Sequence, residues 1–301
     1  MPNNFTDGYA SLFQRALDEQ IVQRAVTGWM DANAGLVQYS GGKDVKIPKM
    51  AMDGLGDYNR NTGYPDGAVT LEYETRTMTQ DRGRKFMLDS MDVDETNFVA
   101  NAGSVMSEFQ RIHVAPEIDA YRLSKLASLA IDADVNVAYS YTPTKSDIVD
   151  VLIDALAEVR NAGFRDMPLV IHATSAVTAA LSKAKSDKAA SVAFIAGGGL
   201  QTTVPSVDNV PVVETDSKRM VSAITVSGNG WEKGSTAKDV NFIITPRVAP
   251  IAITKQDNVK IFTPKQNQSA DAWLLEYRRY HDLWVMDNKI PGIYANMKDA
   301  K

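Results

Sequence analysis

The sequence contains no cysteine and no dense run of lysine or arginine. The missing cysteines exclude disulfide bonds, thiolate metal sites and a cysteine nucleophile. Lys and Arg number 32 against 37 Asp and Glu, which gives a net charge of −5 and a pI near 5.3. Because phosphate contacts dominate affinity for nucleic acid, we expect no tight, specific binding of DNA. The sequence still allows an inward-facing surface that tolerates packed DNA.

The sequence also lacks an apolar run long enough to span a bilayer, so we expect no membrane partner. Its opening stretch, "MPNNFTDGYASLFQRALDEQ", has neither the basic start nor the apolar core of a signal peptide. Hydrophobic residues make up 44% and charged residues 23% of the 301 residues, as in ordinary globular proteins. A chain of this length can bury a real core in one large or two modest domains.

Signals for a reaction centre are weak. The histidines His113, His172 and His281 lie on three different predicted elements, and no flanking motif supports a catalytic or metal-binding role for them. Convergence in space stays open, but packing is the favoured interpretation. The carboxylates of "MDVDET" lack the spacing of a calcium loop, and helix capping explains them. We therefore expect no enzyme, no cofactor and no metal.

The glycines of "SVAFIAGGGLQTT" follow a predicted strand, as a phosphate-binding loop would. Such a loop needs a helix that opens on its glycines. Pro205 and Pro211 argue against a helix there, so a surface loop is favoured.

The stretch "VTLEYETRTMTQDRGRKFMLD" alternates in side-chain character with a period of two and is rich in β-branched and aromatic residues. It predicts a hairpin in which Val69–Met78 pairs with Arg84–Asp89 around a turn at Asp81, Arg82 and Gly83. A lone two-stranded hairpin is marginal in water, so this one must lie against something. A solvated surface flap is the alternative to a limb that reaches a neighbouring molecule.

Other segments have clearer periodicities. Thr6–Met30 predicts a helical arm, and Lys43–Gly67 predicts a turn-rich approach with a short strand at Val45–Ile47. A long helix follows "MDVDET", and Pro116 should kink or interrupt it. The residues expected on its buried face are Phe98, Ala102, Val105, Phe109 and Ile112.

The second half mixes helices and strands without regular alternation, which favours an α+β fold over a doubly wound sheet. The predicted helices are Ser146–Asn161 and Thr174–Ala184. The predicted strands are Met167–His172, Val210–Glu214, Met220–Val226, Asn241–Thr245, Ala249–Thr254, Val259–Phe262 and Trp273–Val285. Glu276, Arg278 and Arg279 are expected on the wet face of the last strand.

The order of arm, polar hairpin, long helix and mixed globular part resembles the major capsid protein of tailed bacteriophages, which has the Hong Kong 97-like fold. The residues that carry the resemblance are "GGKDVKIPKM", "GLGDYNRNTGY", "LEYETRTMTQDRGRKFMLDSMDVDETNF" and "LLEYRRYHDLWVMDNKIPGIYAN". The resemblance implies an N-terminal arm at 1–54, an extended loop at 55–86, and a peripheral domain with the spine helix at 87–144. It implies an axial domain at 145–239 and a return to the peripheral domain at 240–301.

The function implied by this resemblance is structural. The chain would self-assemble into hexamers and pentamers of an icosahedral capsid that encloses double-stranded DNA, with assembly in the host cytoplasm and final location in the virion. A separate scaffolding protein and a portal would be its other partners. The residues expected at contacts between subunits are Tyr58, Arg60, Tyr73, Glu74, Arg76, Met78, Arg82, Arg84, Lys85 and Phe86. The alternatives are an encapsulin-like compartment shell and, from a different class, a cytosolic α+β enzyme that uses His172 or His281.

Overall fold

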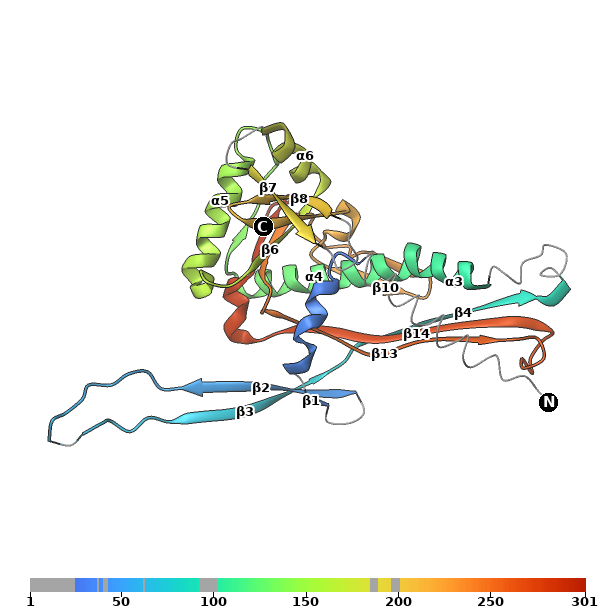
Figure 1. Ribbon diagram of the computed structural model, residues 1–301, viewed down its shortest axis with the longest axis horizontal. Helices are drawn as coiled ribbons and strands as arrows, with labels where there is room; N and C mark the ends of the chain where they lie inside the picture. Colours follow the sequence, from blue (N-terminus) through green and yellow to red (C-terminus); the bar gives the residue numbers. More distant parts are fainter. Residues whose placement is uncertain are drawn as a thin grey trace.

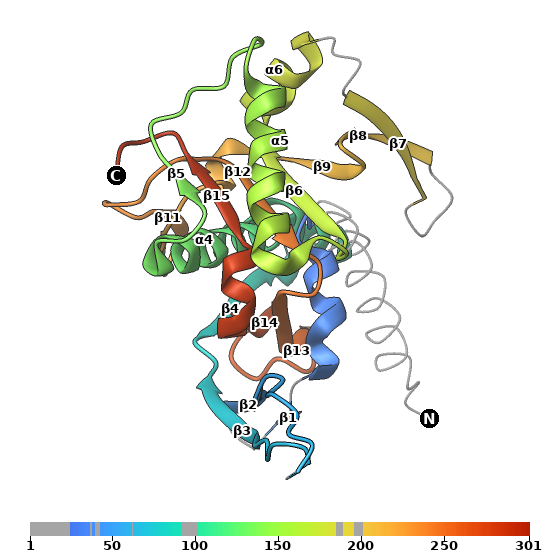
Figure 2. The same cartoon turned by 90° about the vertical axis from the view of Figure 1, so that its left-hand side faces the viewer.

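The computed structural model describes residues 25–36, 38–39, 43–61, 63–91, 102–184, 189–195 and 201–301. It has three parts (Figure 1): a body of helices and strands, a long helix with long strands running beneath it, and a hairpin that projects away from both. The view turned by 90° keeps the hairpin apart from the body (Figure 2). Among the helices of these residues, none has the length and apolar character needed to cross a membrane.

The body contains a seven-stranded mixed sheet. Its strands, in spatial order, are β5 (Val137–Ala138), β15 (Tyr294–Met297), β12 (Val240–Pro246), β6 (Leu169–Thr174), β9 (Val210–Thr215), β8 (Gln201–Val207) and β7 (Ala189–Ile195). Only β5–β15 and β6–β9 pair in parallel. The sheet joins strands expected in two different domains, because β12 and β15 lie beyond residue 239 and still pair within it.

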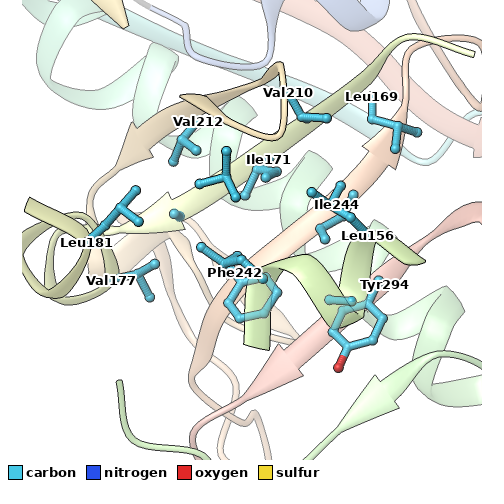
Figure 3. Close-up of a cluster of buried hydrophobic side chains, with 14 of the residues drawn as sticks. Leu156, Leu169, Ile171, Val177, Leu181, Val210, Val212, Phe242, Ile244 and Tyr294 are labelled. Atoms are coloured by element: carbon cyan, nitrogen blue, oxygen red, sulfur yellow. The ribbon is translucent and has the colours of Figure 1, made fainter. Parts of the chain in front are cut away.

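Helices α5 (Ile148–Val159) and α6 (Ser175–Ala184) pack on this sheet and form its core. Leu152 and Leu156 of α5 are fully buried, as the apolar stripe of this segment predicts. They meet Ile171, Phe242 and the other sheet residues shown in Figure 3. Gly163 has a φ of +99° in the turn Arg160–Phe164 that follows α5, a conformation that favours glycine. The predicted helices Ser146–Asn161 and Thr174–Ala184 are therefore confirmed.

The predicted long helix is present as α3 (Ala102–Phe109), a π-helical turn η3 (Gln110–Val114) and α4 (Ala115–Ala133). In the π-turn the amide of Ala115 donates to the carbonyl of Gln110, one residue further back than in an α-helix. Pro116 follows directly and has no amide hydrogen to donate. The expected interruption at Pro116 is thus a wide turn inside a continuous helix. Phe98 lies outside the described residues, as do the side chain of Ala102 and residues 92–101 with the "MDVDET" carboxylates.

The π-turn changes which residues face the core. Val105 and Phe109 pack partly against the cluster beneath the helix, and the next buried positions are Val114 and Ile118. The extra residue in the turn rotates Ile112 outward, where 48% of its surface is exposed. The prediction that Ile112 is a core residue of the helix is therefore wrong.

Beneath the helix lies an antiparallel sheet of three strands in the order β13 (Pro250–Phe262), β14 (Ala272–Val285) and β4 (Gln80–Asp89). Strand β13 merges two predicted strands, with an irregularity between Thr254 and Gln256. Arg279 of β14 is only 7% exposed, and its guanidinium pairs with Asp257. The prediction that Arg279 lies on a solvent-exposed face is therefore wrong, because the helix covers one face of this sheet. The neighbouring Arg278 points to the other face, where it is exposed and pairs with Asp81 at 2.7 Å.

The predicted hairpin has the wrong partner strand. β3 (Val69–Thr77) pairs with β2 (Asp44–Met52), whereas β4 pairs with β14. Asp81, Arg82 and Gly83 form no turn and lie inside β4. A Cβ added at Gly83 would come within 2.9 Å of the carbonyl oxygen of Tyr277. The missing side chain of Gly83 thus permits close approach of β4 to β14. In the sequence alone, such a glycine looks the same as a glycine in a turn.

Smaller elements complete the described chain. β1 (Gln38–Tyr39) pairs with the start of β2, and β10 (Ile224–Ser227) pairs with β11 (Gly230–Lys233). Short 3₁₀ helices are η5 (Ser217–Arg219) and η6 (Asp287–Gly292). The predicted arm helix Thr6–Met30 lies outside the described residues up to position 24, and Gly28–Leu36 forms the 3₁₀ helix η1.

Residues 26–31 are fixed to α4 by buried charges. Asp119 is fully buried and accepts hydrogen bonds from the amide of Thr27 at 3.1 Å, from the Thr27 hydroxyl at 2.6 Å and from Arg219 Nη1 at 3.0 Å. Arg122, 1% exposed, donates to Thr27 O at 2.9 Å and to both carboxylate oxygens of Asp31. Burial raises the pKa of Asp119, while the hydrogen bonds of Thr27 and the charge of Arg219 act in the opposite direction.

We expect Asp119→Asn to lower the free energy of unfolding by about 3 kcal/mol, because it leaves Arg219 without its carboxylate and puts an amide donor among donors. Urea unfolding at pH 7 measures this. Asp132→Asn, at an exposed position of the same helix, is the matched control and should stay within about 0.5 kcal/mol of the parent. Equal stability of the two variants would contradict the role given to Asp119.

Candidate subunit interface

The β2–β3 hairpin carries most of the large apolar side chains that the described part of the chain exposes. Seven of the eleven lie on it, namely Met52, Leu55, Tyr58, Tyr64, Val69, Leu71 and Tyr73. Leu55 is 107% exposed and Tyr64 is 87% exposed, values of side chains that touch almost nothing. A concentration of exposed apolar groups is typical of a surface that binds another protein.

The base of the hairpin is bound to the rest of the chain. Val45, Ile47 and Met78 are buried against Ile251, Ile253, Tyr280 and Trp284 of the sheet β13–β14. Val45 and Ile47 alternate along β2, so one face of the strand faces this cluster. At its edge, Lys49 and Arg76 approach Asp287 at 3.1 and 4.0 Å, but these exposed pairs contribute little.

The corner between β3 and β4 is also fixed. The amide of Met78 donates to Lys43 O at 3.0 Å, and the Tyr280 hydroxyl donates to Met78 O at 3.1 Å. The amide and hydroxyl of Thr79 donate to Asp282 Oδ2 at 2.8 and 3.0 Å. The hairpin therefore leaves the body in a defined direction.

The far end of the hairpin is organised by its own contacts. Asp53 and Ala68 exchange hydrogen bonds at 3.2 and 2.7 Å, and Asn59 and Gly63 do so at 3.2 and 2.7 Å. The rings of Tyr58 and Tyr64 meet edge to face at 5.0 Å. Asp57 precedes Tyr58 in sequence and Asp66 follows Tyr64 by two residues, so the tip carries both aromatic and acidic residues. An ordered loop loses less conformational entropy when it binds.

The structure divides the residues expected at contacts between subunits. Tyr58, Arg60 and Tyr73 are exposed on the hairpin, and Glu74 and Arg76 are half-buried and pair with each other at 2.7 Å. The others lie at its base or on β4, namely Met78, Arg82, Arg84, Lys85 and Phe86.

Some of these residues contact their own chain. Met78 is 3% exposed in the base cluster, so its expected place at a contact between subunits is wrong. Phe86 packs partly beneath the long helix, edge to face with Phe109 at 4.9 Å. Arg82 bonds Glu117 at 2.7 Å, and Arg84 donates to Gly228 O at 2.5 Å. Lys85 is exposed on β4.

The structure adds five exposed contact candidates that are not among the expected residues, namely Met52, Leu55, Tyr64, Val69 and Leu71. The signal was available for Leu55 and Tyr64, because large apolar residues inside a turn-rich stretch have few neighbours to bury them. Val69 and Leu71 were assigned to a hairpin with the wrong partner, and their exposure follows from the pairing of β2 with β3.

The histidines do not form one site in the structure. His172 is fully buried on β6, where its Nε2 accepts from Trp29 Nε1 at 3.1 Å, so the ring proton is on Nδ1, 3.4 Å from Thr215 Oγ1. Burial lowers the pKa of His172 to about 4. His281 is buried on β14, and His113 is exposed on the π-turn. Among the described residues, no group of three histidines or carboxylates is placed to hold a metal ion.

No protein-family model and no curated protein matches the sequence. Solved structures do match the fold. A chain of the bacteriophage PhiM1 mature capsid has a TM-score of 0.57 at 13% identity, over 85% of this chain and 82% of that chain. The capsid of cyanophage P-SCSP1u gives 0.54 at 9% identity, over 86% and 84% of the two chains. The virus-like particle from Pyrococcus furiosus gives 0.55 at 10% identity, over 96% and 99%.

The fold is the Hong Kong 97-like capsid fold. The resemblance found in sequence and the α+β class are thus confirmed at the level of the fold. The helix α3–η3–α4 is called the spine helix below, and the β2–β3 hairpin with the loop 53–68 is called the extended loop, after the elements that the resemblance implies. Residues 80–86, expected in that loop, lie in β4 beneath the spine helix instead.

We expect the hairpin to depend on its base and not on its tip for stability. Met78→Ala should lower the free energy of unfolding by about 2–4 kcal/mol, because it removes a buried side chain. Leu55→Ala should change it by less than about 0.5 kcal/mol, because that side chain is fully exposed. Urea unfolding of the unassembled chain measures both. A tip variant as destabilised as the base variant would show that the tip packs on its own body.

We expect stability to fall as pH drops from about 6.5 toward 4, partly because unfolding lets His172 take up a proton that the folded state refuses. The pKa shift of His172 corresponds to roughly 3 kcal/mol of folding free energy. The protein has this contribution in full above the ordinary histidine pKa of 6.5 and loses it as the pH falls toward 4. His172→Gln, whose amide can accept from Trp29, should show a smaller loss between pH 7 and pH 4.5 in urea unfolding. His113→Gln at the exposed histidine is the control, and equal pH dependence in both variants would refute the assignment.

Proposed function

We propose that this chain is the structural subunit of a tailed-phage capsid and self-assembles into hexamers and pentamers of an icosahedral shell that encloses double-stranded DNA. The observation that carries the proposal is the projecting hairpin, whose exposed apolar tip packs against no other part of the described residues. The capsid fold supports it, because a shell supplies the missing partner from an identical subunit.

Energetics favour a repeated contact. The base of the hairpin is stabilised within the chain, so the subunit folds before it assembles. Each exposed apolar side chain that becomes buried contributes about 25 cal/mol per Å² of area removed from water. Mixed charges along the hairpin, such as Lys46, Arg60 and Glu72, contribute little individually but disfavour wrong registers. Contacts of moderate strength let misplaced subunits leave before the lattice closes.

The proposal extends to domains, location and partners. The seven-stranded sheet with α5 and α6 is the axial domain, and the spine helix with β4, β13 and β14 is the peripheral domain. The subunit is located in the virion after assembly in the host cytoplasm, with a scaffolding protein and a portal as further partners. Its acidic balance suits contact with packed DNA without tight specific binding.

A compartment shell of the encapsulin type is the second candidate. The likeness to the Pyrococcus furiosus virus-like particle favours it, because it spans nearly all of both chains. The contents of purified particles distinguish the two: packaged DNA in particles from infected cells supports the phage capsid, whereas an enzyme cargo without nucleic acid supports the compartment. For the enzyme alternative, His172 offers no free ring nitrogen, since it is enclosed and both of its nitrogens face a neighbour.

We expect the triple variant Leu55→Ser, Tyr58→Ser, Tyr64→Ser to fold normally and to lose assembly, because it removes the apolar groups of the tip and leaves the base intact. Electron microscopy and light scattering of the purified chains measure this, with co-expressed scaffolding protein where the parent chain needs it. The matched control is Ile112→Ser, Met167→Ser, two exposed apolar residues away from the hairpin. Normal shells from the tip variant would overturn the role given to the hairpin.

A further inference from the structure

A cavity of about 210 Å³ lies between the π-turn of the spine helix, strands β4 and β14, and the turn that joins β10 to β11. Its volume exceeds the roughly 150 Å³ of an engineered cavity that binds benzene. Neither the fold nor the proposed assembly assigns it a role. All of its walls belong to the described chain.

One side of the cavity is aromatic and apolar. Phe109 stands edge to face with Phe86 at 4.9 Å and with Tyr277 at 5.9 Å, and Val114 and Ile118 extend this wall. The π-turn places Val114, and not Ile112, toward the cavity side of the helix. π-turns are frequent at functional sites. This wall suits the body of a flat, apolar group.

The lining also carries the two arginines Arg82 and Arg84 beside one glutamate, Glu117, and Arg82, Arg84 and Phe86 alternate along strand β4 on one face. Arg82 and Arg84 donate to the carbonyls of Ser227, Gly230 and Gly228, so the β10–β11 turn closes over them. Arg82 has Glu117 as its counter-ion, whereas Arg84 has no carboxylate partner among the described residues. A guanidinium that faces a cavity without a counter-ion favours an anion there.

The buried part of the lining is incompletely hydrogen-bonded. His281 lines the cavity, is 3% exposed, and its Nδ1 has no hydrogen-bond partner. The pKa of His281 lies well below its ordinary value, mainly because the side chain is buried and further because of the charges of Arg279, Arg122 and Arg82. A buried polar atom without a partner costs free energy, and a ligand in the cavity can supply the missing bond.

We propose that this cavity is a binding site for a carboxylate carried on an aromatic or small apolar body. The body lies against Phe86, Phe109 and Tyr277, and the carboxylate accepts hydrogen bonds from Arg84 and the neighbouring cationic side chains. Two sources provide this chemistry. One is a free organic acid, and the other is an acidic side chain beside an aromatic one, as in Asp57–Tyr58 at the hairpin tip of a second copy.

The experiment uses the full chain, kept unassembled as verified by light scattering, with 4-hydroxyphenylacetate as the probe and 4-hydroxyphenylacetamide as its neutral match. We expect saturable binding of the acid by calorimetry and little binding of the amide. Arg84→Gln, which keeps a donor for Gly228 O but removes the charge, should weaken binding of the acid about tenfold. Arg165→Gln, an exposed cation on the body, should leave it unchanged.

A second arm identifies the source. A synthetic peptide of residues 53–68 that displaces the probe assigns the site to the hairpin of another copy. Probe binding that the peptide does not disturb assigns it to a free acid. No saturable binding of the acid, equal binding of acid and amide, or an Arg84→Gln variant that binds like the parent each overturns the proposal. Because binding is measured before assembly, failure here leaves the capsid proposal untouched, and failure to form shells leaves this result untouched.

Discussion

Strand β14 is paired along both edges, with β13 on one side and β4 on the other, and three of the four hydrophobic clusters draw on it. Leu275 and Tyr277 lie beneath the first half of the spine helix, Leu283 and Val285 contact its second half, and Tyr280 and Trp284 hold the base of the hairpin. A two-stranded ribbon is marginal in water, but a ribbon whose base packs on a three-stranded sheet is stable. The projecting limb therefore depends on a strand more than 190 residues away in sequence.

Under the proposed function, the molecule separates two requirements, folding and association. Folding is satisfied internally: the body has its own core around Phe242, and residues 26–31 are fixed to the spine helix by Asp119 and Arg122. Association is left to side chains that contribute nothing to that core. Substitutions at the tip and substitutions at the base should therefore have separate consequences, one on assembly and the other on the subunit itself.

Local periodicity was enough to predict most elements, and long-range pairing was not. The stripe of α5, the long helix and the strands β6, β9, β12 and β14 follow from patterns that each segment carries in itself. The pairing of β3 with β2 depends on which strand is nearest in space. Gly83 resembles a turn residue in the sequence, because the contact that requires a glycine there is with the backbone of β14.

Two further errors have equally physical causes. Ile112 was placed on the buried face because a steady helical period cannot anticipate an extra residue in the π-turn. Met78 was grouped with the exposed tip because burial is a property of the assembled cluster and not of the strand pattern. The contact residues expected from the sequence omit Leu55 and Tyr64, although large apolar residues inside a turn-rich stretch indicate exposure, and the structure shows both side chains exposed.

Because the corner at Met78 and Thr79 is fixed, a small change of angle there produces a large displacement at the far end of the hairpin. The nine residues of β3 alone span roughly 30 Å, so a tilt of about 10° at the corner carries the far end through about 5 Å. That displacement exceeds the tolerance of any hydrogen bond or ring contact. The hydrogen bonds of Tyr280 and Asp282 to this corner consequently determine the position of distant side chains such as Leu55.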